Sequence, residues 1–158
     1  MAAKPKPLKE GDSAPDFRME SDDGTVAKAD FKGRNLVLYF YPRDNTPGCT
    51  KEACGFNEHL KAFAKADTGV VGVSRDSVKS HGNFRAKFDL AFALGADADG
   101  VVTENYGVWV QKQNYGRKYM GIERATFLID KKGKIARIWR KVKVAGHVEE
   151  VLAAAKGL

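Results

Sequence analysis

The chain has 158 residues, of which 43% are hydrophobic and 30% charged, and its formal net charge is +7. This length allows one sizeable core, two cysteines are too few for a disulfide-stapled scaffold, and no apolar run approaches the roughly 20 residues that span a bilayer. We therefore expect a soluble, cytoplasmic protein with no membrane partner.

The N-terminal stretch MAAKPKPLKE is positively charged but has no apolar run, so we do not expect a secretory signal. It is rich in lysine and proline, and we predict that residues 1–10 form a flexible segment. We find no repeat, linker or low-complexity tract in the remainder. Residues 11–158 are therefore predicted to form a single domain.

The first half of this domain predicts a hairpin, two buried strands and a helix between them. The hairpin is expected to turn at Asp22–Gly24. The run NLVLYFY (35–41) is hydrophobic on both faces, which is typical of a central strand covered on both sides. Apolar residues spaced three and four apart predict a helix over 47–65. Gly69 is expected to break the chain before a second strand over 70–74.

The second half continues the alternation and then closes with a hairpin and a helix. The predicted elements are a helix at 77–88, a strand at 90–96, a short helix at 100–108, strands at 124–130 and 134–140, and a helix at 147–158. Strands separated by helices imply right-handed crossovers and a sheet covered on both faces. The expected fold class is α/β, with a central mixed β-sheet flanked by helices and an N-terminal β-hairpin addition.

Functional sites in such sheets lie at the carboxyl ends of the strands, and the stretch PRDNTPGCTKEAC (42–54) follows the first buried strand. We expect Thr46 to be the N-cap of the helix and Pro47 its first residue, where the missing N–H has no cost. Cys49 then lies in the first turn, where unpaired N–H groups and the helix dipole stabilise an anion. Gly48 removes side-chain bulk beside it. We predict a reactive Cys49 thiolate that small molecules can reach.

The second cysteine, Cys54, lies five residues after Cys49. In an ideal helix, Cα atoms at this spacing are about 8.7 Å apart, whereas a disulfide needs about 4.4–6.8 Å. If both cysteines are helical, they either never bond or bond only when the first turns of the helix unwind. The second case suits a redox cycle with two conformations.

The longer stretch YPRDNTPGCTKEAC resembles the active-site motif of the peroxiredoxins, and most of all the peroxiredoxin Q group, also called bacterioferritin comigratory protein. Three further segments resemble the family in the same order, so the resemblance covers nearly the whole chain. They are GDSAPDF (11–17), VSRDSVKSH (73–81) and ERATFLID (123–130). The resemblance implies a thioredoxin-like fold with N-terminal additions, which agrees with the predicted order of elements.

By this resemblance, Cys49 is the peroxidatic cysteine and Cys54 the resolving cysteine of the same chain. Pro42, Thr46 and Arg124 match the other active-site positions of the family. The resemblance implies reduction of hydrogen peroxide and organic hydroperoxides, in antioxidant defence, without a metal or an organic cofactor. It also implies an intramolecular disulfide between the two cysteines, regeneration by thioredoxin or a similar dithiol, and a monomer.

The residues by themselves leave other interpretations open. The cysteines could be two buried small hydrophobes, or the pair of a general thiol–disulfide oxidoreductase, although C-x4-C differs from the C-x-x-C of thioredoxin-type dithiols. A nucleic-acid-binding module could use the basic stretch 131–143, but lysines on an edge strand also prevent edge-to-edge pairing. We expect no nucleic-acid partner. The three histidines form no metal-ligand pattern.

Overall fold

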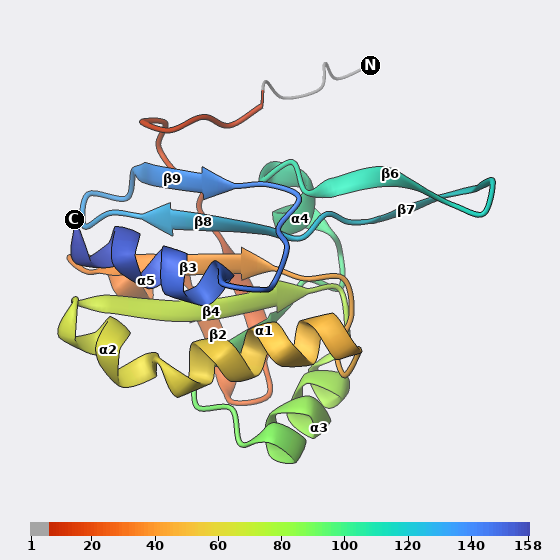
Figure 1. The fold of residues 1–158 in the computed structure, drawn as a ribbon, viewed down its shortest axis with the longest axis horizontal. Coiled ribbons are helices and arrows are strands. Elements are labelled where there is room, and N and C mark those ends of the chain that lie inside the picture. Colours follow the sequence, from red (N-terminus) through yellow and green to blue (C-terminus); the bar gives the residue numbers. More distant parts are fainter. Residues whose placement is uncertain (1–6) are drawn as a thin grey trace.

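The computed structural model describes residues 7–158 and has a seven-stranded sheet at its centre (Figure 1). The strands are β1 (Arg18–Ser21), β2 (Gly24–Ala27), β3 (Asn35–Phe40), β4 (Thr68–Ser74), β5 (Ala93–Ala96), β6 (Trp109–Asn114), β7 (Arg117–Ile122), β8 (Ala125–Ile129) and β9 (Ile135–Trp139). The helices are α1 (Pro47–Glu58), α2 (Leu60–Lys65), α3 (Val78–Phe88), α4 (Val101–Asn105), α5 (His147–Lys156) and the short 3-10 helix η1 (Lys28–Phe31).

The central sheet is mixed, as the sequence predicted, and has the strand order β2-β1-β5-β4-β3-β8-β9. β3, β4 and β5 are parallel, because each is joined to the next through a helix. β8 and β9 are antiparallel to their neighbours. The predicted N-terminal hairpin extends the far edge of the same sheet, where β1 pairs with β5.

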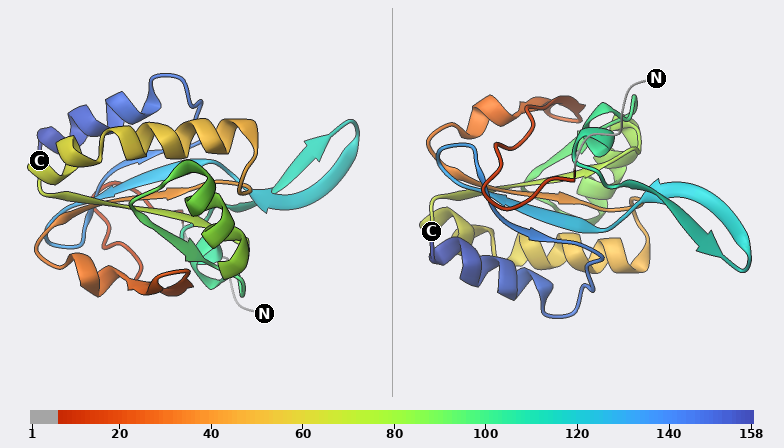
Figure 2. Two further views of the ribbon diagram at one scale, coloured as in Figure 1. Left: turned by 90° about the horizontal axis from the view of Figure 1, so that it is seen from below. Right: turned by 90° about the horizontal axis from the view of Figure 1, so that it is seen from above.

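Alternating side chains of β3 divide the core into two layers. Leu36, Leu38 and Phe40 lie in one hydrophobic cluster, with residues of the N-terminal region and α4. Val37 and Tyr39 belong to the other, with residues of α1, α3 and α5. Figure 2 shows α1, α2 and α5 on one face of the sheet and η1 on the other. Both faces of β3 are therefore covered by other elements and shielded from solvent, which explains its continuous apolar run.

The long helix predicted over 47–65 is two helices, because α1 ends at Glu58, α2 begins at Leu60, and His59 lies between them. The His59 side chain lies with Nδ1 2.9 Å from the carbonyl oxygen of Gly55. A side chain that bonds the carbonyl four residues earlier competes with the helical backbone bond. The apolar spacing continued across this position, so the sequence pattern did not reveal the break.

One further expectation from the sequence is wrong, and one hairpin was not predicted. Gly69 lies inside β4 and does not precede it, since that strand begins at Thr68. A Cβ atom on Gly69 would lie 2.5 Å from the ring of Phe31, so glycine is needed there for close packing. The chain also forms the hairpin β6–β7, to which the sequence assigned no element. It projects from the body of the molecule (Figure 1) and turns at Tyr115 and Gly116, both with positive φ.

The predicted flexible segment 1–10 is only partly described, since residues 1–6 lie outside the described residues. Leu8 packs against the core, and its carbonyl accepts a hydrogen bond from Arg140. Within residues 7–158, no helix has the length and apolarity needed to cross a membrane.

Candidate active site

The loop after β3 leads directly into α1, and Thr46 is the N-cap residue of that helix, as predicted. Its backbone is extended (φ −93°, ψ 155°), and its carbonyl accepts the first helical bond from the Thr50 N–H at 2.8 Å. The side chain differs from the expected cap, because its hydroxyl donates to the Arg43 carbonyl at 3.0 Å. Pro42 is exposed in the same loop.

Cys49 is the third residue of α1 and is only 1% exposed. We expected Gly48 to leave the Cys49 thiol open to small molecules, but in this conformation the thiol is buried. A Cβ atom on Gly48 would lie 3.2 Å from Nη2 of Arg124, so the missing side chain makes room for a guanidinium group. The first turn of α1 thus places a sulfur beside a fixed cation.

Arg124 connects the two halves of the site. It lies between β7 and β8, and antiparallel pairing of β8 with β3 brings it to the end of the sheet where α1 begins. Its Nη2 donates to Sγ of Cys49 at 3.3 Å, and its Nη1 donates to Oε1 of Glu52 at 2.7 Å. One guanidinium therefore holds a carboxylate with one nitrogen and faces the sulfur with the other. Burial lowers the pKa of Arg124, but the nearby Glu52 and Cys49 raise it by more. The net shift is upward, so the guanidinium stays charged.

Glu52 is a site residue that the sequence reasoning missed. It is fully buried, and among the described residues its second oxygen, Oε2, has no hydrogen-bond partner. Burial raises the pKa of Glu52 to about 7, although Arg124 opposes the shift. The available signal was the spacing from Cys49, because residues three apart lie on the same helix face. A buried carboxylate beside a thiol fixes Arg124 through a short ion pair.

Cys54 lies in the same uninterrupted helix as Cys49, and both thiols are free. Cys54 is half-buried, whereas Cys49 faces the core. The helical spacing of about 8.7 Å between their Cα atoms therefore applies, and it exceeds the disulfide range. In this conformation the two sulfurs cannot bond.

Comparison with known proteins agrees with this geometry. The model of the AhpC/TSA family matches residues 10–138. The putative peroxiredoxin bcp of Coxiella burnetii is 52% identical over 143 residues, covering 90% of this chain and 95% of its own. The peroxiredoxin Bcp of Bacillus subtilis is 49% identical, with 94% and 95% covered. This chain is a peroxiredoxin of the AhpC/TSA family.

Solved structures show the same relationship for the fold. Peroxiredoxin Q of Xanthomonas campestris superposes with a TM-score of 0.85 at 46% identity, covering 89% of this chain and 90% of that one. A PrxQ mutant from Xylella fastidiosa gives a TM-score of 0.90 at 40% identity, with 97% and 98% covered. The thioredoxin-like fold expected from the sequence is confirmed. The protein is a thiol-dependent peroxidase, an oxidoreductase with a peroxide as oxidant and a thiol as reductant.

The environment of Cys54 in this peroxiredoxin disfavours its thiolate. Burial raises the pKa of Cys54, and the negative charge of Glu58, one helical turn later, raises it further. A raised pKa means that the thiolate forms only at a higher pH. The folded helix therefore disfavours the Cys54 thiolate relative to that of a solvent-exposed cysteine.

The raised pKa of Cys54 is measurable in a Cys49→Ser variant, where Cys54 is the only thiol. We expect its alkylation by iodoacetamide to reach half its maximal rate at a higher pH than in a free cysteine peptide. Adding Glu58→Gln should move that midpoint to lower pH, because the like charge is gone. Glu104→Gln, which removes a carboxylate on α4, is the matched control and should leave the midpoint in place. An unchanged profile in the Glu58 variant would contradict the assignment.

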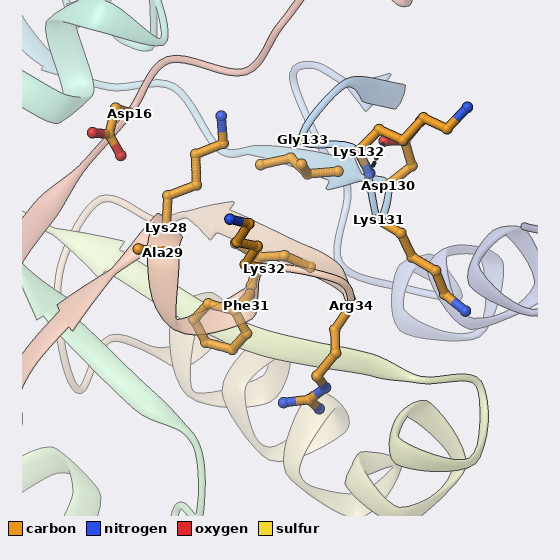
Figure 3. A pocket seen from close by; sticks show the side chains of 12 residues that line it. Asp16, Lys28, Ala29, Phe31, Lys32, Arg34, Asp130, Lys131, Lys132 and Gly133 are labelled. Carbon is orange, nitrogen blue, oxygen red and sulfur yellow. Dashed lines mark hydrogen bonds between the residues drawn. The ribbon is translucent and has the colours of Figure 1, made fainter.

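A cavity lies at the opposite end of the sheet and is separate from the cysteines. It has a volume of about 360 Å³ and lies at the amino end of β3 (Figure 3). Five of its lining side chains are basic, namely Lys28, Lys32, Arg34, Lys131 and Lys132. Arg34 and Lys131 share the carboxylate of Asp67 at 3.6 and 3.1 Å. Part of the predicted basic stretch thus lies here, on the surface and partly neutralised.

Proposed function

We propose that this peroxiredoxin reduces hydrogen peroxide and organic hydroperoxides with Cys49 as the peroxidatic cysteine and Cys54 as the resolving cysteine of the same chain. The observation that carries the proposal is the 3.3 Å contact between Nη2 of Arg124 and Sγ of Cys49. Glu52 holds the same guanidinium in place through Nη1. A fixed cation at a buried sulfur stabilises a thiolate and the charge that develops during its oxidation.

In the first step, the Cys49 thiolate attacks the nearer oxygen of the hydroperoxide. An S–O bond forms, the O–O bond breaks, and the alkoxide or hydroxide leaves and takes a proton, so Cys49 becomes a sulfenic acid. Negative charge moves along S–O–O during this step. Arg124 is placed to donate to that charge through hydrogen bonds.

Thr46 and Pro42 are assigned supporting roles by the family resemblance. The Thr46 hydroxyl gives its hydrogen to the Arg43 carbonyl, so its oxygen keeps lone pairs that can accept from a peroxide O–H. Pro42 shields the thiolate side of the loop without presenting an N–H. Organic hydroperoxides are included because the 46% identical bacterioferritin comigratory protein of Xanthomonas campestris is described as having alkyl peroxide reduction activity.

In the second step, Cys54 attacks the sulfenic acid, and water leaves as the disulfide forms. The continuous helix α1 requires its first turns to unwind for this step. Thioredoxin or a similar dithiol then restores both thiols by exchange and is itself oxidised to a disulfide. Both cysteines lie in one chain, so a monomer can complete the cycle. The cytoplasm, where thiols are kept reduced, is the compartment that suits it.

Intact mass after one equivalent of hydrogen peroxide tests both assignments at once. The wild-type protein should lose two hydrogens, because the pair ends as a disulfide. The Cys54→Ser variant should instead gain one oxygen, because its sulfenic acid has no thiol partner. Gain of oxygen in the wild type, or loss of two hydrogens in the variant, would refute the resolving role of Cys54.

A further inference from the structure

Asp44 is a buried carboxylate in the loop between β3 and α1, and the proposed chemistry does not use it. Its Oδ1 accepts a hydrogen bond from the Tyr41 hydroxyl at 2.6 Å. Its Oδ2 lies 2.7 Å from the Ser80 hydroxyl and 2.7 Å from Nδ1 of His81, both on α3. Three donors therefore converge on one side chain two residues before Thr46.

The partner His81 is fully buried and has an acceptor at each ring nitrogen. Nε2 lies 3.0 Å from the Gly95 carbonyl oxygen, which can only accept, so Nε2 carries a hydrogen. Burial raises the pKa of Asp44, but the hydrogen bonds from His81 and Tyr41 outweigh it, and the pKa is lowered. Nδ1 of His81 lies 2.7 Å from Oδ2 of this carboxyl group. Asp44 and His81 form a buried, hydrogen-bonded pair.

The backbone of Asp44 is tied as well. Its N–H donates to Oδ2 of Asp76 at 2.8 Å, and Asp76 accepts a second bond from the Ser74 hydroxyl at 2.7 Å. The carboxylates of Asp44 and Asp76 and the His81 ring lie close enough to hold a metal ion. The oxygens that would bind one already accept O–H and N–H donors, so the group is complete as a hydrogen-bond network.

These ties fasten the loop to the end of β4, to α3 and to β5, but they stop before the helix. Lys87 of α3 donates to Oδ1 of Asn45 at 3.2 Å. Thr46 itself makes only a local side-chain bond, to the Arg43 carbonyl, and the next distant ties are those of Cys49 and Glu52 to Arg124. The chain therefore changes at Asn45–Thr46 from a segment held by three elements to the turns that must unwind for Cys49 to meet Cys54.

We propose that Asp44, through its hydrogen bonds with Tyr41, Ser80 and His81, is a positioning residue that holds residues 42–45 in place while the first turns of α1 unwind and reform. This inference rests on the proposed peroxidase cycle. The anchored loop keeps Pro42 and Thr46 in the arrangement that peroxide attack needs. It also favours the return of Cys49 to Arg124, so it opposes the open conformation.

The two chemical steps should consequently respond in opposite directions when the anchor is loosened. Peroxide attack needs the folded site, so it becomes slower. Disulfide formation needs the unwound helix, so it becomes faster. Loss of stability alone would not produce this split, because a generally weaker fold does not select one end of one helix.

The test compares wild type with Asp44→Asn by rapid quench, following sulfenic acid and disulfide separately by mass after one equivalent of hydrogen peroxide. We expect sulfenic acid formation to slow about tenfold, because small misplacements of reacting groups have effects of this size or larger. Disulfide formation should become several times faster, with less sulfinic acid at high peroxide. Ser80→Ala, which removes only one of the three donors, should give a smaller split of the same sign.

Asp97→Asn is the matched control, since Asp97 is also buried and accepts bonds from the Val102 and Thr103 N–H groups. It should leave the ratio of the two rates unchanged. The proposal is overturned if both rates fall together in the Asp44 and Ser80 variants, or if Asp97→Asn gives the same split. Absence of any Cys49–Cys54 disulfide in the wild type would instead refute the proposed cycle itself.

Discussion

Replacement of Cys49 by serine is expected to reduce peroxide consumption by at least about a thousandfold, because a serine hydroxyl does not ionise near neutral pH and is a poor nucleophile toward peroxide. Arg124 and Glu52 would remain in place around the new hydroxyl, since serine is similar in size. The measurement is hydrogen peroxide consumption with thioredoxin, thioredoxin reductase and NADPH. A Cys49→Ser protein that reduced peroxide at the native rate would disprove the assignment.

The Cys54→Ser variant is the internal control for this experiment. It should consume one equivalent of peroxide at a rate near that of wild type and then stop with thioredoxin as reductant. Its sulfenic acid should also be more readily over-oxidised, because no thiol of the same chain removes it. If both serine variants abolished the first turnover equally, the two cysteines would not have the separate roles proposed here.

Replacement of Arg124 by methionine is expected to slow sulfenic acid formation about a hundredfold, which is the range for loss of one preorganised donor at a developing anion. Arg124→Lys should recover little, because an ammonium cannot hold Glu52 with one nitrogen and face Cys49 with another. The measurement is the second-order rate constant with hydrogen peroxide, from stopped-flow single turnovers.

Arg137→Met provides the matched control for this experiment. Arg137 is an exposed arginine on β9, where it lies over the ring of Trp139 and has no contact with the cysteines. Its replacement should change the rate constant by less than about twofold, since exposed charges contribute little. Equal losses in the Arg124 and Arg137 variants would point to the net charge of the protein instead of a specific contact.

The helix that carries the cysteines shows why part of the site was predictable. Thr46, Pro47 and the position of Cys49 follow from capping rules, which involve only neighbouring residues. The buried run of β3 and the order of strands and helices follow from hydrophobic patterns of the same local kind. The break at His59 was not predicted, because the apolar spacing continues across it and the contact of the His59 ring with the Gly55 carbonyl oxygen leaves no mark in that spacing.

Other features depend on residues that are distant in the sequence. Arg124 is 75 residues from Cys49, and without the family resemblance it is one basic residue among many. Its place is decided by the pairing of β8 with β3. Glu52 becomes distinctive only because it is buried opposite that arginine, and Asp44 only because α3 brings His81 to it.

The sequence by itself determined the class of fold, the helix start at Thr46 and the spacing that prevents Cys49 and Cys54 from bonding within a helix. These depend on backbone geometry and on contacts a few residues apart. Only the tertiary structure decided that Cys49 is buried, that the space beside Gly48 holds a guanidinium, and that Asp44 meets His81. Burial and ion pairing depend on which elements meet, and that is settled by packing over the whole chain.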